Sequence, residues 1–194
     1  MLKSYGDIEK ITQALSLIAS SIDRISPFKA LKILYLVDRY CFRKFQYFVT
    51  DDTYVAMRKG PEPLYAYELI EGSVGVNVDI DDINYFKKFI SIENNEIKSI
   101  RLDRTVFDKT EIEALEKIIS KFINEKDAVL GEMTHKLQDF IKKEAYLEME
   151  HQVIMDRNDM LIEEPYIEEP CYKFRNDYER ALAYETCGFE DNKN

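Results

Sequence analysis

Acidic residues and a lysine occur in a pattern that could bind a metal ion. An acidic stretch contains Asp79, Asp81 and Asp82, and the triplet Glu96-Ile97-Lys98 follows it. In metal-dependent nucleases, carboxylates hold Mg²⁺ beside a strand pair while a lysine steadies the attacking water. The same residues lie beside an expected hairpin turn, where polar side chains are common. An alternative function is therefore a metal-dependent nuclease, with the candidate residues Asp81, Asp82, Glu96 and Lys98.

Other reactive side chains give little support for catalysis. Glu148 and His151 have the spacing that places a carboxylate and an imidazole on one helical face, but di-iron bundles need this pair twice. Cys41 lies in an apolar stretch, where a small buried side chain is expected. The sequence contains no GxSxG, GxxxxGK(S/T), GxGxxG or HExxH. We therefore expect a protein that is not an enzyme, with no catalytic residue, metal or cofactor.

The segment from Tyr54 to Tyr65 has the residue types of a protein interface. In the expected strand, side chains alternate between two faces, and the stiff turn 60–63 then presents Tyr65 at the start of a helix. Tyrosine, methionine and arginine are enriched where proteins bind each other. Alternatively, these aromatic side chains complete the core at a strand-to-helix corner, and composition alone leaves both readings open.

Helical periodicity and capping signals predict most of the elements that would position these residues. Ser26 and Pro27 have the types of an N-cap and a first helical residue, and Asp108 with Glu111 has the spacing of a capping box. Asn94-Asn95 separates two short strands, because asparagine tolerates the positive φ of a tight hairpin turn. We expect helices over residues 8–22, 28–45, 64–70, 108–122, 129–133 and 137–150, and strands over 53–58, 89–92 and 96–100.

Residues 28–45 are apolar on most sides, which places this helix at the centre of a domain with other elements around it. Lys59 to Pro63 is expected to end the preceding strand, because proline and glycine interrupt sheet pairing. The predicted fold class is therefore α+β: a mostly helical domain around a central apolar helix, with a small antiparallel β-sheet or hairpin.

Charge is distributed unevenly along the chain, which has 27 Lys and Arg residues, 37 Asp and Glu residues and a net charge of −10. Residues 1–60 carry a net charge of +4, residues 61–150 carry −8 and residues 151–194 carry −6. An acidic surface repels a phosphate backbone and attracts basic proteins. General nucleic-acid binding is therefore not expected, and a basic protein partner is favoured.

The last part of the sequence differs from the rest. Residues 151–194 form an acidic, proline-punctuated extension, in which Phe174, Tyr178 and Leu182 predict a short amphipathic helix. We therefore expect a domain over residues 1–150 and an extension over 151–194. No apolar run approaches the ~18 residues that a membrane span needs, and the N-terminus lacks the pattern of a signal peptide. Three cysteines without a CxxC pair favour the reducing cytoplasm.

Three blocks of sequence resemble the Panacea domain, also called the SocA-like antitoxin domain. The first is Lys29 to Tyr40, KALKILYLVDRY, and the second is Asp52 to Pro63, DTYVAMRKGPEP. The third is Gly131 to Lys136, GEMTHK, which is similar to the later Thr-His element of that family. The resemblance covers about Ser26 to Glu150 and leaves out the acidic extension.

The resemblance implies an α+β domain without known catalysis that neutralises a protein toxin by binding it. It further implies a role as a proteolytic adaptor for a cytoplasmic AAA+ protease. The alternatives are a phage-associated interaction protein without a toxin and a homo-oligomer. From this match and from the segment's composition, the expected partner-binding residues are Tyr54, Met57, Arg58, Lys59, Pro61, Pro63 and Tyr65. The expected structural residues of the family blocks are Asp38, Gly60, Thr134 and His135.

Overall fold

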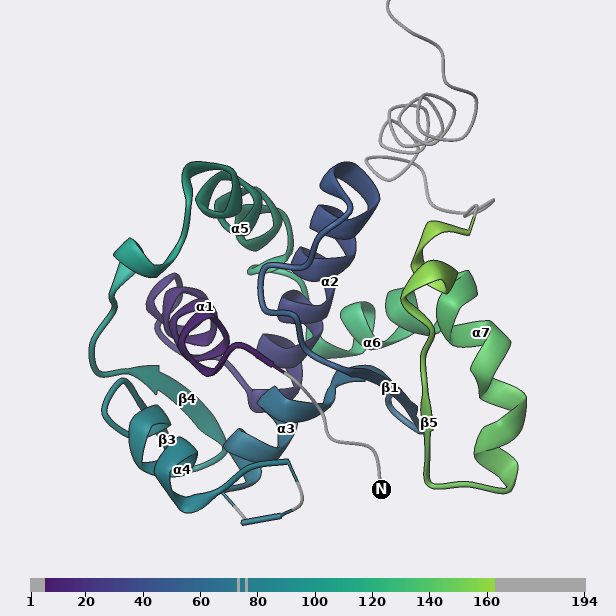
Figure 1. Ribbon diagram of the computed structural model, residues 1–194, viewed down its shortest axis with the longest axis horizontal. Coiled ribbons are helices and arrows are strands. Elements are labelled where there is room, and N and C mark those ends of the chain that lie inside the picture. Colours follow the sequence, from purple (N-terminus) through teal and green to yellow (C-terminus); the bar gives the residue numbers. More distant parts are fainter. Residues whose placement is uncertain (1–5, 73, 76, 163–194) are drawn as a thin grey trace, which may run out of the picture.

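The computed structural model describes residues 6–72, 74–75 and 77–162 and has an α+β architecture (Figure 1). The helix predicted around Phe174 to Leu182 lies outside these residues. Within the described part, no helix has the length and apolar character needed to cross a membrane. The α-helices are α1 (Ile8–Ser20), α2 (Pro27–Phe45), α3 (Leu64–Glu71), α4 (Ile80–Phe86), α5 (Lys109–Phe122), α6 (Asp127–His135) and α7 (Gln138–Glu144). The strands are β1 (Tyr54–Met57), β2 (Gly60–Pro63), β3 (Ile90–Glu93), β4 (Glu96–Ser99) and β5 (Gln152–Ile154), and the 3-10 helices are η1 (Arg104–Val106), η2 (Ala145–Glu148) and η3 (Arg157–Leu161).

Helix α2 forms the centre of the domain, as its apolar sequence predicts. It packs against α1, α5, α6 and β2, and most of its side chains are buried. Ser26 caps its first turn by accepting a hydrogen bond from the N–H of Lys29 at 3.1 Å, and Pro27 is its first residue. The prediction of a central helix surrounded by other elements is confirmed.

Local chemistry also determines where α5 begins. Asp108 accepts a hydrogen bond from the N–H of Glu111 at 2.8 Å, and the Glu111 carboxylate accepts one from the N–H of Asp108 at 2.9 Å. These reciprocal bonds form the predicted capping box. The Glu111 carboxylate also binds Lys10 of α1 at 2.6 Å, so the cap connects two helices that are distant in sequence.

A three-stranded antiparallel sheet has the order β2-β1-β5. Here one expectation is wrong: residues 60–63 do not form a turn but the strand β2, with Tyr54 opposite Pro63 and Met57 opposite Gly60. The reason is that β2 is an edge strand, where a residue without an N–H leaves no bond of the ladder unmade on the side away from β1. The reversal instead lies at Arg58-Lys59. Strand β5, from the segment expected to be an extension, pairs with the other edge of β1.

The second sheet is the hairpin β3–β4, whose turn residues Asn94 and Asn95 have φ values of 53° and 61°. Positive φ at both central residues is the geometry that two-residue hairpins need, so this prediction is confirmed. Helix α3 ends at the C-cap residue Gly72, whose φ is 66°. Helix α7 is shorter than expected: the α-helix stops at Glu144 and tightens into η2, after which the chain returns to β1 through β5.

Candidate partner-binding site

The three sequence blocks meet at one corner of the domain, where α2 packs against β2 and α6 packs against both. A buried ion pair joins the first two blocks. The Lys32 ammonium donates to the Pro61 carbonyl and to the Glu62 carboxylate, each at 2.7 Å. Burial lowers the pKa of Lys32 and raises that of Glu62, which means that the loss of hydration outweighs their mutual attraction. The pair fixes β2 on α2.

Gly60 joins the third block to this corner. Its φ is +99°, and a Cβ atom at this position would lie 2.9 Å from Cδ2 of His135 and 3.1 Å from the Lys32 ammonium. Only glycine fits, because any other residue would strain the backbone at this positive φ and its Cβ would clash with two neighbouring groups. The His135 ring packs on Phe140 with ring centroids 4.7 Å apart, and the Thr134 hydroxyl donates to the Gly131 carbonyl. The His135 ring therefore lies between Gly60 of β2 and Phe140 of α7.

Asp38, on α2, organises the loop before β1. Its carboxylate accepts hydrogen bonds from the N–H groups of Val49 and Thr50, at 2.8 and 3.1 Å, from the Thr50 hydroxyl, and from the Tyr54 hydroxyl at 2.6 Å. Complete burial raises the pKa of Asp38 to about 6 even though these donors favour the ionised form. Asp38 therefore holds the loop and the first residue of β1 against the central helix.

Asp52 performs a role that the sequence did not reveal. Its two carboxylate oxygens accept from the N–H groups of Tyr65 and Ala66, at 2.9 and 3.0 Å, at the start of α3. The residue in the N-cap position is Pro63, which has no side-chain acceptor, so Asp52 caps the helix from another segment. Burial raises the pKa of Asp52 to about 7. The only sequence signal was a helix start without its own capping side chain.

The expected contact residues divide into buried and exposed groups. Tyr54 is 2% exposed and Tyr65 is 6% exposed, while Pro61 and Pro63 are also buried. The Tyr54 ring packs edge-on against Tyr35 and Phe48, at centroid distances of 5.4 and 5.5 Å. The expectation that these tyrosines and prolines form a contact surface is therefore corrected: they complete the core of the corner, which was the alternative interpretation.

The remaining expected contact residues lie together at the β1–β2 reversal. Met57 is partly exposed, and Arg58 and Lys59 are exposed. We call Met57, Arg58 and Lys59 the β1–β2 tip. Asp38 and Lys32 anchor β1 and β2 on α2, and the tip that joins these strands combines a partly exposed apolar side chain with two exposed cations.

The residues of the alternative nuclease site are not assembled into a metal site. Asp79 and Asp82 form the capping box of α4, and Lys98 binds Glu93 at 2.9 Å on the β3–β4 hairpin. In the part of the chain that the structure describes, no three His, Cys, Asp or Glu side chains form a group that could hold a metal ion. Acidic residues near a helix start are explained by capping, which the sequence pattern could not distinguish from metal binding.

Glu148 and Cys41 also have structural explanations. Glu148 ends η2 and His151 follows it outside any helix, so the two side chains do not share a helical face. Cys41 is completely buried in α2, and burial raises the pKa of its thiol well above the ordinary value. A thiol that stays protonated is a poor nucleophile.

The fold and this corner define a small α+β domain in which the shared sequence blocks build a rigid support for an exposed tip. The chain belongs to the family described as antitoxin SocA-like, Panacea domain, whose model matches residues 31–140, more than half of the sequence. All three blocks overlap this range. Neither a curated protein nor a solved structure matches the chain.

Proposed function

We propose that this protein is an antitoxin that neutralises a protein toxin by direct binding and catalyses no reaction itself. The observation that carries the proposal is the family match over residues 31–140. The net charge of −10 supports a basic partner, because opposite charge speeds the encounter of two proteins. The cysteine content supports a cytoplasmic location. Delivery of the toxin to a AAA+ protease, a phage-associated role and homo-oligomerisation remain predictions.

The β1–β2 tip is the proposed contact surface. Arg58 and Lys59 supply donors for carboxylates or carbonyls of the partner, and Met57, the last residue of β1, supplies adaptable apolar surface beside them. The support below the tip is buried and hydrogen-bonded, so little conformational entropy is lost when the partner binds. The net negative charge of the whole protein thus attracts a basic partner, while the basic β1–β2 tip makes the local contact with it.

A charge reversal at the tip tests this proposal. The full-length protein is co-expressed with the product of the adjacent gene, and growth rescue and the binding affinity of the purified pair are measured. Lys59→Glu should weaken binding by at least about tenfold and abolish rescue, with an unchanged melting temperature. The matched control is Lys109→Glu, because Lys109 is also exposed but begins α5.

Two results would contradict the proposal. In the first, the adjacent product is not toxic, or it binds Lys59→Glu and Lys109→Glu equally well. In the second, the purified protein cleaves DNA or RNA with Mg²⁺ and Glu96→Ala abolishes the cleavage, which would favour the nuclease.

A further inference from the structure

The last turn of α2 holds the final residues that the structure describes. The Arg43 guanidinium donates to the carbonyls of Met160 and Ile162, at 2.6 and 3.0 Å, and Arg43 itself is buried. Asp159 in η3 binds Lys142 of α7 at 2.7 Å, which attaches the same segment to a second helix. The chain therefore leaves the described part of the domain beside the end of α2.

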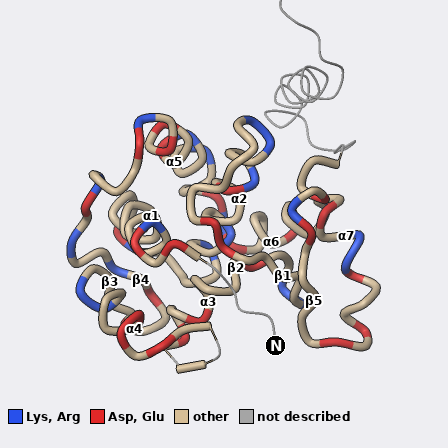
Figure 2. Tube along the Cα trace, viewed as in Figure 1, with Lys and Arg blue, Asp and Glu red and all other residues tan. Residues whose placement is uncertain are grey.

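A basic face lies next to this point, on the packed helices α2 and α5. The ammonium groups of Lys44 and Lys117 both lie over the Tyr40 ring, 5.8 and 5.1 Å from its centroid. Lys121 follows Lys117 by four residues, so it lies on the same side of α5, and both are exposed. We call Lys44, Lys117 and Lys121 the α2–α5 basic face. Figure 2 shows basic positions at the end of α2 and along α5.

The positive charge of this face is not explained by its own helices. Each of the three glutamates in α5 pairs with a cation outside the face. The pairs are Glu111 with Lys10, Glu113 with Lys109 and Glu116 with Arg104. A cation in the last turn of a helix complements the helix dipole, which accounts for Lys44 and Lys121 but not for Lys117, which lies earlier in α5. The face therefore favours a negatively charged ligand.

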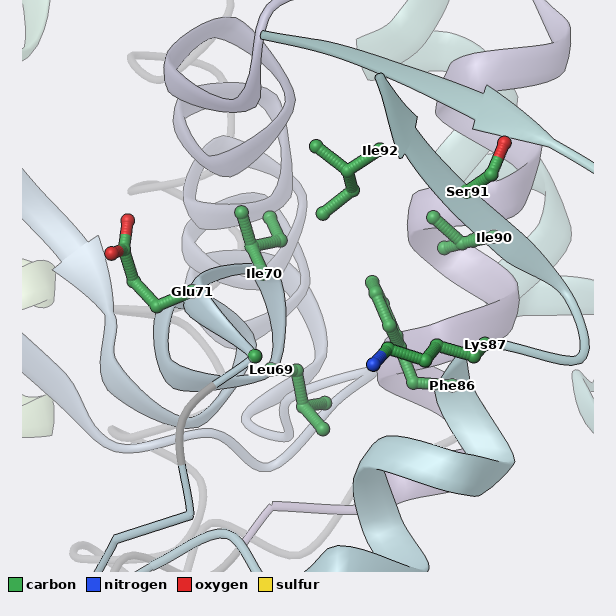
Figure 3. A pocket seen from close by; sticks show the side chains of 9 residues that line it. Leu69, Ile70, Glu71, Phe86, Lys87, Ile90, Ser91 and Ile92 are labelled. Atoms are coloured by element: carbon green, nitrogen blue, oxygen red, sulfur yellow. The ribbon is translucent and has the colours of Figure 1, made fainter. Parts of the chain in front are cut away.

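A hollow elsewhere in the domain has no such preference. It has a volume of about 510 Å³ and lies between α3, the end of α4 and β3 (Figure 3). Glu71 and Lys87 both line it, so its charge favours neither a cation nor an anion. The α2–α5 basic face is the site whose charge identifies its ligand.

The sequence directly after Ile162 supplies a ligand of this kind. Residues 163–169 read EEPYIEE, with four glutamates and no lysine or arginine. Covalent geometry places Glu163 and Glu164 within roughly 8 Å of the Cα of Ile162, which Arg43 holds beside Lys44. The covalent connection gives these carboxylates a high effective concentration at the face. A separate polyanion has no such advantage, because the net charge of −10 repels it.

We propose that the acidic stretch 163–169 binds the α2–α5 basic face of its own chain and closes this face to other anions. Carboxylates of the stretch accept hydrogen bonds from the ammonium groups of Lys44, Lys117 and Lys121. A basic partner competes with these lysines for the same glutamates, so its binding uncovers the face. This contact is separate from the β1–β2 tip and does not depend on it.

Carbodiimide cross-linking of the full-length protein tests the contact, because the reagent joins a carboxylate and an amine that touch, with loss of water. Peptide mapping of the monomeric product should find Lys44, Lys117 or Lys121 joined to residues 163–169. Exposed charges are screened by salt, so about 1 M NaCl should lower the yield at least about fivefold. Lys109 is the reference amine, since it is exposed and begins α5, and its yield should be at least about tenfold lower.

Neutral variants of the stretch test whether it closes the face. A variant with glutamine at positions 163, 164, 168 and 169 should bind a single-stranded oligothymidine at least about tenfold more tightly than the unaltered protein, measured by fluorescence anisotropy at low salt. Adding Lys117→Glu and Lys121→Glu should abolish the gain. The matched control replaces four exposed glutamates of other elements by glutamine and should change the affinity by no more than about twofold. These are Glu71, Glu144, Glu148 and Glu150.

The proposal is overturned if residues 163–169 do not cross-link to the basic face, or if Lys109 cross-links to them equally well. Cross-links between two copies, detected by mixing isotopically labelled and unlabelled protein, would assign the stretch to a second molecule and also overturn it. Equal oligothymidine affinities of the four-glutamine variant and its control would refute the closing role. None of these results bears on the Lys59→Glu test.

Discussion

Breaking the buried ion pair at the corner should destabilise the fold far more than breaking an equally short pair on the surface. Lys32 and Glu62 lie 2.7 Å apart with side chains 0% and 6% exposed. In Lys32→Met the Glu62 carboxylate loses its counter-ion, its other oxygen already lacks a hydrogen-bond partner among the described residues, and the Pro61 carbonyl loses a donor. Removing one partner of a buried pair costs about 3–5 kcal/mol, because the remaining charge is neither hydrated nor neutralised.

This loss is large compared with the stability of an ordinary domain, which is about 5–15 kcal/mol. For a chain of this length it corresponds to a fall in melting temperature of roughly 6–20 °C. The double variant Lys32→Met/Glu62→Gln should recover part of the loss, because no uncompensated charge remains. The pKa directions support this expectation: burial shifts both groups toward their neutral forms, so the intact pair itself contributes little net stability.

Urea unfolding followed by far-UV circular dichroism measures these changes at constant m-value. The control is Lys136→Met, which breaks the exposed pair between Lys136 and Glu132 at 2.6 Å. This variant should leave the free energy of unfolding unchanged within error, because exposed pairs contribute little. The reasoning fails if Lys32→Met is no more destabilising than Lys136→Met. It also fails if the losses of unfolding free energy in the single variants Lys32→Met and Glu62→Gln simply add in the double variant.

The parts of the fold that follow from local chemistry could be predicted from the sequence. Helix α5 begins after Asp108 because its cap and the reciprocal Glu111 lie three residues apart. The β3–β4 turn follows from Asn94 and Asn95, which adopt positive φ at modest cost. The central position of α2 follows from its apolar character on most sides. In each case, the interacting residues are neighbours in the sequence.

The parts that depend on distant segments were not predicted. Strand β2 contains two prolines, and only its edge position in the sheet makes them acceptable. Strand β5 pairs with β1 across about a hundred residues of sequence, and no local signal marks that partner. Asp52 caps a helix that begins twelve residues later.

The candidate site shows the same limit. Tyr54 and Tyr65 have the composition of a binding surface, but both are buried by tertiary packing, in which Tyr54 contacts Asp38 and Tyr35. Aromatic and small polar residues are common both in interfaces and at buried corners. Only the fold distinguishes the tip, which is exposed, from the support, which is not.

Two further perturbations examine the support directly. Gly60→Ala should cost clearly more than Gly72→Ala, which we expect to cost about 1 kcal/mol: both positions have positive φ, but only at Gly60 would the new Cβ meet a neighbour, the His135 ring. Equal losses in urea unfolding would mean that the ring moves aside without cost. The free energy of unfolding should also fall as pH rises from about 4 to about 7, because folding raises the pKa of Asp38 from 3.8 to about 6 and that of Asp52 to about 7. In this window the folded state binds protons that the unfolded state has released, and raising the pH removes a stabilisation on the order of 3 kcal/mol per group. Asp52→Asn should make the pH dependence of urea unfolding shallower, and an unchanged slope would show that Asp52 is ionised in the folded protein throughout this range.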